Sequence, residues 1–182
     1  MDVYDAIDKR RTIRIFKKGA SEEQLRRIIL AGSKAPSGGN RQPWEFIVID
    51  DPKIIDQLGE LKYQLNRRFI PDEGETQKDV DERALKQKRG FQNSSVVAVC
   101  TKAGQSVNGW LAVENMSLAA VAEGLGSNII SYWEAEKKEV EKALGLPADY
   151  ELTCVLKFGV PGEGAPAPKR RPEGSWLHKN KF

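Results

Sequence analysis

The stretch SVVAVCTKAGQSVNGWLAVENMSLAAVAEGLGSNIIS, residues 95–131, decides the class of fold. Its first seven residues, Ser95–Thr101, are an apolar run typical of a buried strand. Residues 108–124 place apolar side chains in nearly all directions, which predicts a helix at the centre of the molecule or in a subunit interface. Residues 127–131 then predict a short strand. Strands and helices intermix without a strict βαβ rhythm, so we expect an α+β (mixed α/β) fold.

Further elements lie on both sides of this central unit. Asp2 is placed to cap a first helix, and Ser21–Gln24 form a capping box that opens a second helix ending near Gly32. Gly145 marks the end of the last expected helix. The expected helices cover residues 3–9, 21–32, 53–61 and 136–144, and the expected strands cover residues 45–49 and 152–158.

The composition indicates one globular domain that covers residues 1–182. Hydrophobic residues make up 40% of the chain and charged residues 30%, which is typical of soluble proteins. No apolar run approaches the ~20 residues of a membrane span, and residues 1–5 are acidic and polar, unlike a signal peptide. We therefore expect a cytoplasmic protein without membrane contact. The net charge of +3 is too small to indicate a dedicated nucleic-acid binder.

Two segments depart from this average composition. Residues 62–90 carry fourteen charged residues among 29, and two interpretations are open for them. They are either a solvated helical excursion or flexible loop, or a lid over a functional site. From about residue 161 a C-terminal extension begins that is rich in proline and glycine.

The sequence excludes several kinds of catalytic site. Its two cysteines, Cys100 and Cys154, and its single histidine, His178, are too few and too scattered for a zinc site. The cysteines lie in strand-like runs and are expected to be buried thiols. No glycine is followed by lysine, so the chain has no P-loop. We expect a site that works without a metal and without histidine.

Two basic clusters lie near the two ends of the chain. Residues 10–14 (RRTIR) place three guanidinium groups and a hydroxyl close together, and residues 169–171 (KRR) are similarly basic. Ile13 and Ile15 alternate with the basic residues, which indicates that the first cluster is anchored to the core. The planar fork of arginine suits phosphate because it donates two parallel hydrogen bonds. The alternative is a solvated basic surface.

Residues 36–44 (PSGGNRQPW) predict a loop that displays two side-chain amides, Asn40 and Gln42. An amide offers both a donor and an acceptor, which matches a heterocycle edge that presents carbonyl, N–H and carbonyl groups in turn. The alternative is an ordinary loop whose amides satisfy backbone groups. Together, the arginines and amides suit an anionic, planar heterocycle such as FMN, whose reduced form a guanidinium group would stabilise.

In these segments the chain resembles the nitroreductase-like family of FMN oxidoreductases. The likeness rests on residues 10–14, 35–44, 115–127 and 168–172, which occur in the order typical of the family. The resemblance implies a central, mostly antiparallel sheet flanked by helices. It also implies a homodimer with FMN at the subunit interface.

The resemblance further implies which residues contact FMN. The phosphate, the ribityl chain and the pyrimidine end of the ring would be held by Arg10, Arg11, Thr12 and Arg14, with a further phosphate contact among Lys169, Arg170 and Arg171. The flavin would also be reached from the other subunit by Pro36, Ser37, Gly38, Asn40 and Gln42. The opposite side of the ring would be lined by Ile130 and Ser131. After Ser131 the chain departs from the Pro-x-Glu-Gly-like stretch of larger members.

The activity implied is transfer of a hydride from NADH or NADPH to flavin N5, followed by transfer of the electrons to an acceptor. The acceptor would be an electron-poor small molecule such as a nitroaromatic compound or a quinone, and the kinetics would be ping-pong. One alternative is specialised chemistry on the same fold, either flavin fragmentation or reductive dehalogenation. Others are a flavin-binding module without turnover, and a basic interaction protein that touches nucleic acid.

Overall fold

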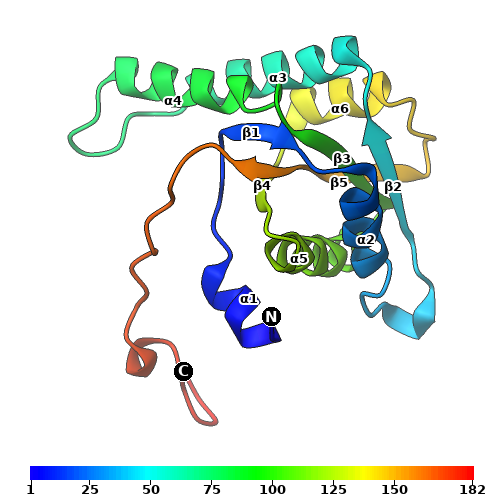
Figure 1. Cartoon of the computed structure of the whole chain (residues 1–182), viewed down its shortest axis with the longest axis vertical. Helices are drawn as coiled ribbons and strands as arrows, with labels where there is room; N and C mark the ends of the chain where they lie inside the picture. Colours follow the sequence, from blue (N-terminus) through cyan, green and yellow to red (C-terminus); the bar gives the residue numbers. More distant parts are fainter.

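The computed structural model describes all 182 residues and is built on one five-stranded sheet (Figure 1). The strands are β1 (Phe16–Gly19), β2 (Trp44–Ile49), β3 (Ser95–Lys102), β4 (Gly126–Ile130) and β5 (Tyr150–Pro161). The long strand β5 is central, because it pairs with β1, β3 and β4, while β2 pairs with β3. All of these pairs are antiparallel, which confirms the predicted sheet.

Helices cover both faces of the sheet, which confirms the mixed α/β class (Figure 1). They are α1 (Val3–Lys9), α2 (Glu22–Gly32), α3 (Pro52–Arg67), α4 (Gln77–Arg89), α5 (Ser106–Ala122) and α6 (Glu134–Ala143), with short 3-10 turns η1 (Gly38–Asn40) and η2 (Glu173–Ser175). One face carries α3, α4 and α6, and the other carries α2 and α5. No helix combines the length and the apolarity that crossing a membrane requires.

Side chains that alternate along β5 build a core on each face. Leu152 and Val155 pack toward the face that carries α3 and α6, whereas Leu156 and Phe158 pack toward α2 and α5. The helix α5 is central as predicted: Met116 is completely buried against the sheet. Because buried apolar area is the main favourable term in folding, these two cores fix the sheet on which the basic segments are placed.

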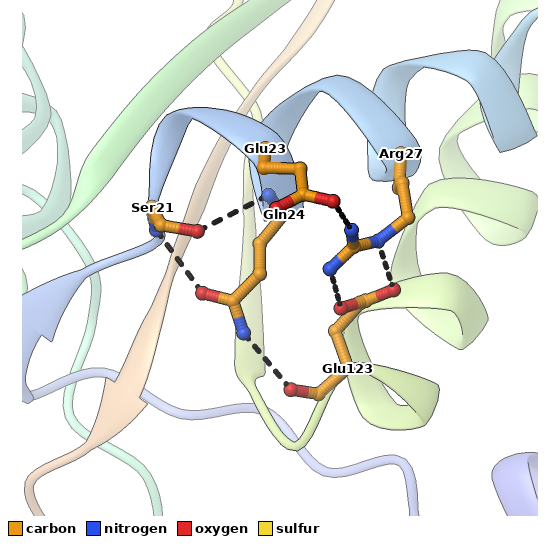
Figure 2. Close-up of polar contacts among 5 residues, drawn as sticks. All are labelled: Ser21, Glu23, Gln24, Arg27 and Glu123. Carbon is orange, nitrogen blue, oxygen red and sulfur yellow. Dashed lines mark hydrogen bonds and ion pairs between the residues drawn. The ribbon is translucent and has the colours of Figure 1, made fainter.

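Polar contacts fix α2 to the end of α5 (Figure 2). The predicted capping box is present, since Ser21 Oγ accepts a hydrogen bond from Gln24 N at 3.2 Å and Ser21 N donates to Gln24 Oε1 at 3.1 Å. Gln24 Nε2 also donates to Glu123 O at 3.1 Å. Arg27 donates two hydrogen bonds of 2.7 Å to the carboxylate of Glu123, which hold the pKa of Glu123 below its usual value.

Residues 62–90 are mostly helical, because α3 continues to Arg67 and α4 begins at Gln77. The two helices lie side by side (Figure 1). Val80 and Ala84 bury an apolar stripe of α4, so the segment is packed rather than loose. A role as a lid remains a prediction. The extension after Pro161 leaves the sheet and runs past α1 with nearly all of its side chains exposed.

Candidate functional site

The Arg14 side chain lines three neighbouring clefts that lie between the C-terminal extension and α3. The tail cleft, about 370 Å³, is lined by residues 10–12, Arg14, residues 165–168 and Arg170. The outer cleft, about 890 Å³, lies between residues 14–15 and one side of α4. The inner cleft, about 310 Å³, lies among α3, α4 and the end of β4. Because all three share Arg14, they form one candidate site.

The basic segment 10–14 is held in place by its apolar residue, as predicted. Ile13 is 6% exposed, and its backbone N donates to Ser127 O at 2.9 Å. A Cβ on Gly126 would lie 2.5 Å from Ile13 Cγ1, so this close approach requires glycine. With Ile13 buried, the side chains of Arg11, Thr12 and Arg14 are left to line the clefts.

Glu163, which sequence analysis did not single out, fixes the backbone of this segment. Its Oε1 accepts hydrogen bonds from Arg14 N at 3.0 Å and Ile15 N at 3.3 Å. Its Oε2 lies 2.5 Å from Lys86 Nζ on α4. Burial alone would raise the pKa of Glu163, but the contacts with Lys86, Arg14 and Ile15 hold it below its usual value. One carboxylate therefore ties the end of β5, the basic segment and α4 together.

The tail cleft brings together arginines from both ends of the chain, as predicted. No carboxylate lines this cleft. Arg11 Nη1 donates to the carbonyls of Asp8 and Arg10, and Arg10 lies 3.9 Å from the carboxylate of Glu114. No hydrogen bond or ion pair joins the guanidinium of Arg170 to another residue. Lys169 and Arg171 do not line the cleft, so Arg170 is the residue that the structure places beside the first cluster.

The amide loop does not meet the arginines within one chain. Gly39, Asn40 and Gln42 have φ values of 60°, 54° and 47°, a conformation that glycine and asparagine tolerate best. Gln42 Nε2 donates to Asn40 Oδ1 at 3.2 Å, and Ser37 Oγ accepts from Gln42 N at 2.9 Å. The loop between α2 and β2 lies on the other side of α5 from α1 (Figure 1). Pro36 and Gly38 are exposed there.

Of the two residues predicted at the end of β4, Ser131 lines a cleft and the side chain of Ile130 does not. Ser131 lines the inner cleft together with Ile129. The side chain of Ile130 is instead completely buried in the core beside Leu58, because alternate residues of a strand face opposite sides of the sheet. Only backbone atoms of Ile130 are therefore positioned for a ligand in the cleft.

Lys62, on α3, is a buried cation in the inner cleft. Its side chain is 6% exposed, and its Nζ donates to Ser131 O at 2.9 Å and lies 4.8 Å from the centre of the Trp133 ring. No carboxylate pairs with it. Burial lowers the pKa of Lys62 to about 8. The only sequence signal for this residue is its place in the charged segment, which contains many other cations.

A second buried lysine lies next to the inner cleft. Lys157, on β5, is fully buried, donates to Gln87 O at 3.2 Å and lies 4.7 Å from the centre of the Phe91 ring. Burial first, and the charge of Arg14 second, lower the pKa of Lys157 to about 7. In contrast to the lysines, Cys100 and Cys154 are buried thiols, as predicted, and burial raises the pKa of Cys100 to about 12.

Comparisons with known proteins show which sequences and structures this chain is similar to. The sequence model of the nitroreductase family matches residues 7–160. The chain is 30% identical to the iodotyrosine deiodinase of Thermotoga neapolitana, over 92% of this chain and 91% of that protein. It is 28% identical to a protein of Thermus thermophilus named NADH dehydrogenase, over 90% of this chain and 88% of that one. A crystal structure of oxidised iodotyrosine deiodinase bound to FMN and 3-iodo-L-tyrosine superposes over 100% of both chains, with a TM-score of 0.80 and 27% identity.

Proposed function

The chain belongs to the nitroreductase family, and we propose that it is an FMN-dependent oxidoreductase that uses NADH or NADPH to reduce an electron-poor small molecule. Nitroaromatic compounds and quinones are the expected acceptors. The observation that carries the proposal is the tail cleft, where Arg170 lies beside residues 10–14 with no carboxylate among the lining side chains.

The tail cleft fits the phosphate group of FMN. Arg11, Arg14 and Arg170 line this cleft and have no carboxylate partner, so their guanidinium groups repel one another, and a doubly charged anion would remove that repulsion. Arg10, Arg11 and Arg170 would hold the phosphate, with the Thr12 hydroxyl as a further donor. The side chain of Arg14 extends from this cleft toward the outer and inner clefts, and it would contact the ring.

The residues of the chain would bind and tune the cofactor. Bound FMN would supply the two-electron chemistry by accepting a hydride from the nicotinamide donor and giving the electrons to the acceptor. The Arg14 guanidinium would favour the reduced, more negative ring. Glu163 holds the backbone from which the Arg14 side chain reaches the clefts.

We also propose that the functional unit is a homodimer, in which Asn40 and Gln42 reach the flavin bound to the other chain. The distance between the amide loop and the arginines within one chain supports this arrangement. Large apolar side chains are also exposed on α1 and α5, including Tyr4 (77%), Ile7 (48%), Trp110 (41%) and Leu111 (42%). Neighbouring exposed apolar residues are typical of an interface between proteins, and α1 packs on α5.

A second candidate function is reductive dehalogenation of an aromatic compound on the same cofactor. The full-length similarity to iodotyrosine deiodinase supports it. The helix pair α3 and α4 also borders the inner cleft, where it is placed to discriminate among substrates. Flavin fragmentation has no comparable support in the geometry of the clefts.

The test begins with the visible spectrum of the purified protein and identification of any chromophore released by heat. NADH and NADPH are then added separately without oxygen, and each acceptor class is offered to the reduced protein. The proposal predicts FMN, bleaching by at least one nicotinamide, and parallel lines in double-reciprocal plots. A coloured protein that neither nicotinamide bleaches would instead be a binding module. Turnover only with a haloaromatic acceptor would select the second candidate.

A further inference from the structure

We propose that the inner cleft is the acceptor subsite of this enzyme, and that it selects a planar aromatic acceptor that carries a carboxylate, with Lys62 as the counter-charge. This inference rests on the proposed function, because the acceptor must reach FMN held at Arg14. Three features of the cleft support it: its charge, its aromatic wall and its buried amide oxygens.

The charge of the cleft is positive and largely uncompensated. Arg14, Lys62 and Arg83 line it, and no aspartate or glutamate does. Only Arg83 has a carboxylate partner, Glu75. The Lys62 ammonium has three N–H groups, and its single hydrogen bond is to Ser131 O. An unpaired charge is costly to bury, so an anion beside Lys62 would be stabilised there.

The mouth of the cleft has an aromatic wall. The rings of Phe69 and Trp133 are stacked with their centres 6.0 Å apart and an angle of 22° between their planes. Both side chains are 41% exposed, so they retain surface for another ring. A planar ligand that packs there, with its acidic group directed at Lys62, gains stacking and ion pairing together.

Two buried amide oxygens in the cleft have no hydrogen-bond donor. They are Oδ1 of Asn66, one helical turn after Lys62 on α3, and Oε1 of Gln87 on α4. Asn66 is only 9% exposed. Buried acceptors are normally paired with a donor, and a hydroxyl or amino group on the ligand ring would supply one. The cleft therefore combines a site for an anion with two hydrogen-bond acceptors that have no donor.

The test compares 4-nitrobenzoate with 4-nitrobenzamide, a neutral analogue of nearly the same shape, using the FMN-loaded protein and saturating nicotinamide. The wild type is expected to favour the benzoate by about tenfold in kcat/KM, the factor that corresponds to ~1.4 kcal/mol. Lys62→Met should bring the ratio close to one. Lys62→Arg should retain part of the preference, and the exposed helix residue Lys53 serves as control, because Lys53→Met should leave the ratio unchanged.

Binding of unreactive benzoate to the oxidised protein gives a second readout. We expect benzoate to perturb the visible spectrum of the bound flavin and to lose about tenfold in affinity in Lys62→Met. Retention of FMN, seen in the same spectrum, shows that the variant is folded. Salt should weaken benzoate binding in the wild type, because the interaction is ionic.

The outcomes separate this inference from the proposed function. If the wild type reduces both acceptors equally well, or Lys62→Met keeps the preference, the inference is wrong while the oxidoreductase remains. It is also wrong if Lys62→Met alters the ratio of NADPH to NADH use and leaves the acceptor ratio unchanged, since the anion would then be a nucleotide phosphate. If no nicotinamide reduces the bound FMN, the proposed function is wrong, and benzoate binding still tests the subsite.

Discussion

The carboxylate of Glu163 accepts a hydrogen bond from the backbone N–H of Arg14 at 3.0 Å, although 149 positions separate the two residues. This contact connects the segment after β5 with the basic segment after α1. It brings the C-terminal extension to the arginines of the N-terminus, and the ion pair of Glu163 with Lys86 adds α4. The position of Arg14, which all three clefts share, therefore depends on a residue outside the recognisable motifs.

The first prediction concerns this contact. Glu163→Leu should lower the free energy of unfolding by about 3 kcal/mol, because two backbone donors lose a charged acceptor. It should also weaken FMN binding at least tenfold. Glu163→Gln should lose less, since an amide oxygen still accepts a hydrogen bond. Urea unfolding and FMN titration measure both effects, with the exposed Glu173→Leu as control. Equal values for Glu163→Leu and the control would contradict this role.

The second prediction concerns Arg14 itself. Arg14→Ala should weaken FMN retention and lower the reduction potential of the bound flavin, because positive charge near the ring favours the reduced form. Arg14→Lys should fall between the wild type and Arg14→Ala, and the exposed Arg26→Ala should change neither property. Anaerobic redox titration measures the potential. An unaltered potential in Arg14→Ala would remove this residue from the ring contacts.

The third prediction concerns the pH dependence of stability. In the folded state burial lowers the pKa of Lys157 from 10.5 to about 7, with Arg14 acting in the same direction and Glu163 against it. At a pH between these two pKa values, Lys157 is protonated in the unfolded state and largely deprotonated in the folded state. The unfolded state therefore binds more protons than the folded state, and the free energy of unfolding should rise with pH, by up to ~1.4 kcal/mol per pH unit. Below pH 7 the full cost of burying the charge remains.

Lys157→Met should remove this contribution and stabilise the protein most at low pH. Urea unfolding of both proteins at pH 7, 8 and 9 gives the comparison, and the difference between them cancels the other titrating groups. Identical slopes against pH in the two proteins would show that Lys157 is not a desolvated cation.

The fourth prediction concerns the homodimer. Asn40→Leu and Arg10→Ala should each impair FMN binding at both sites. When the two variants are mixed and reassembled, each heterodimer should regain one complete site, because one chain supplies Arg10 and the other supplies Asn40. The flavin content of the heterodimer measures this rescue. A heterodimer that binds no more FMN than its parents would rule out a site shared between chains.

Much of the fold could be predicted from local patterns in the sequence. The capping box at Ser21 predicted α2, and the strand expected over residues 152–158 lies within β5. Strand β1 could not be predicted, because two of its four residues are lysines and its pairing depends on the distant end of β5. Helix α4 was not predicted, because it lies in the charged segment 62–90, although Thr76 and Asp79 form a capping box at its start.

The candidate site also contains residues that the sequence could single out and residues that it could not. Residues 10–14 could be singled out, since arginines beside apolar anchors carry a local signal for phosphate, whereas the sequence did not distinguish Arg170 from Lys169 and Arg171. Glu163, Lys86 and Lys62 carry none, because their roles arise only where β5, α4 and α3 approach the basic segment. The burial of Ile130 likewise depends on which way the end of β4 faces.

The most direct measurement on the phosphate site is titration of the flavin-free protein with FMN and with riboflavin, which lacks the phosphate. If arginines from both ends of the chain hold that phosphate, FMN should bind one molecule per chain, about 100-fold more tightly than riboflavin, which corresponds to ~2.7 kcal/mol. Arg170→Ala should reduce this advantage and Lys169→Ala should not. Equal affinity for the two flavins, or no binding of FMN by a folded protein, would contradict the claim that arginines from both ends of the chain hold the phosphate of FMN.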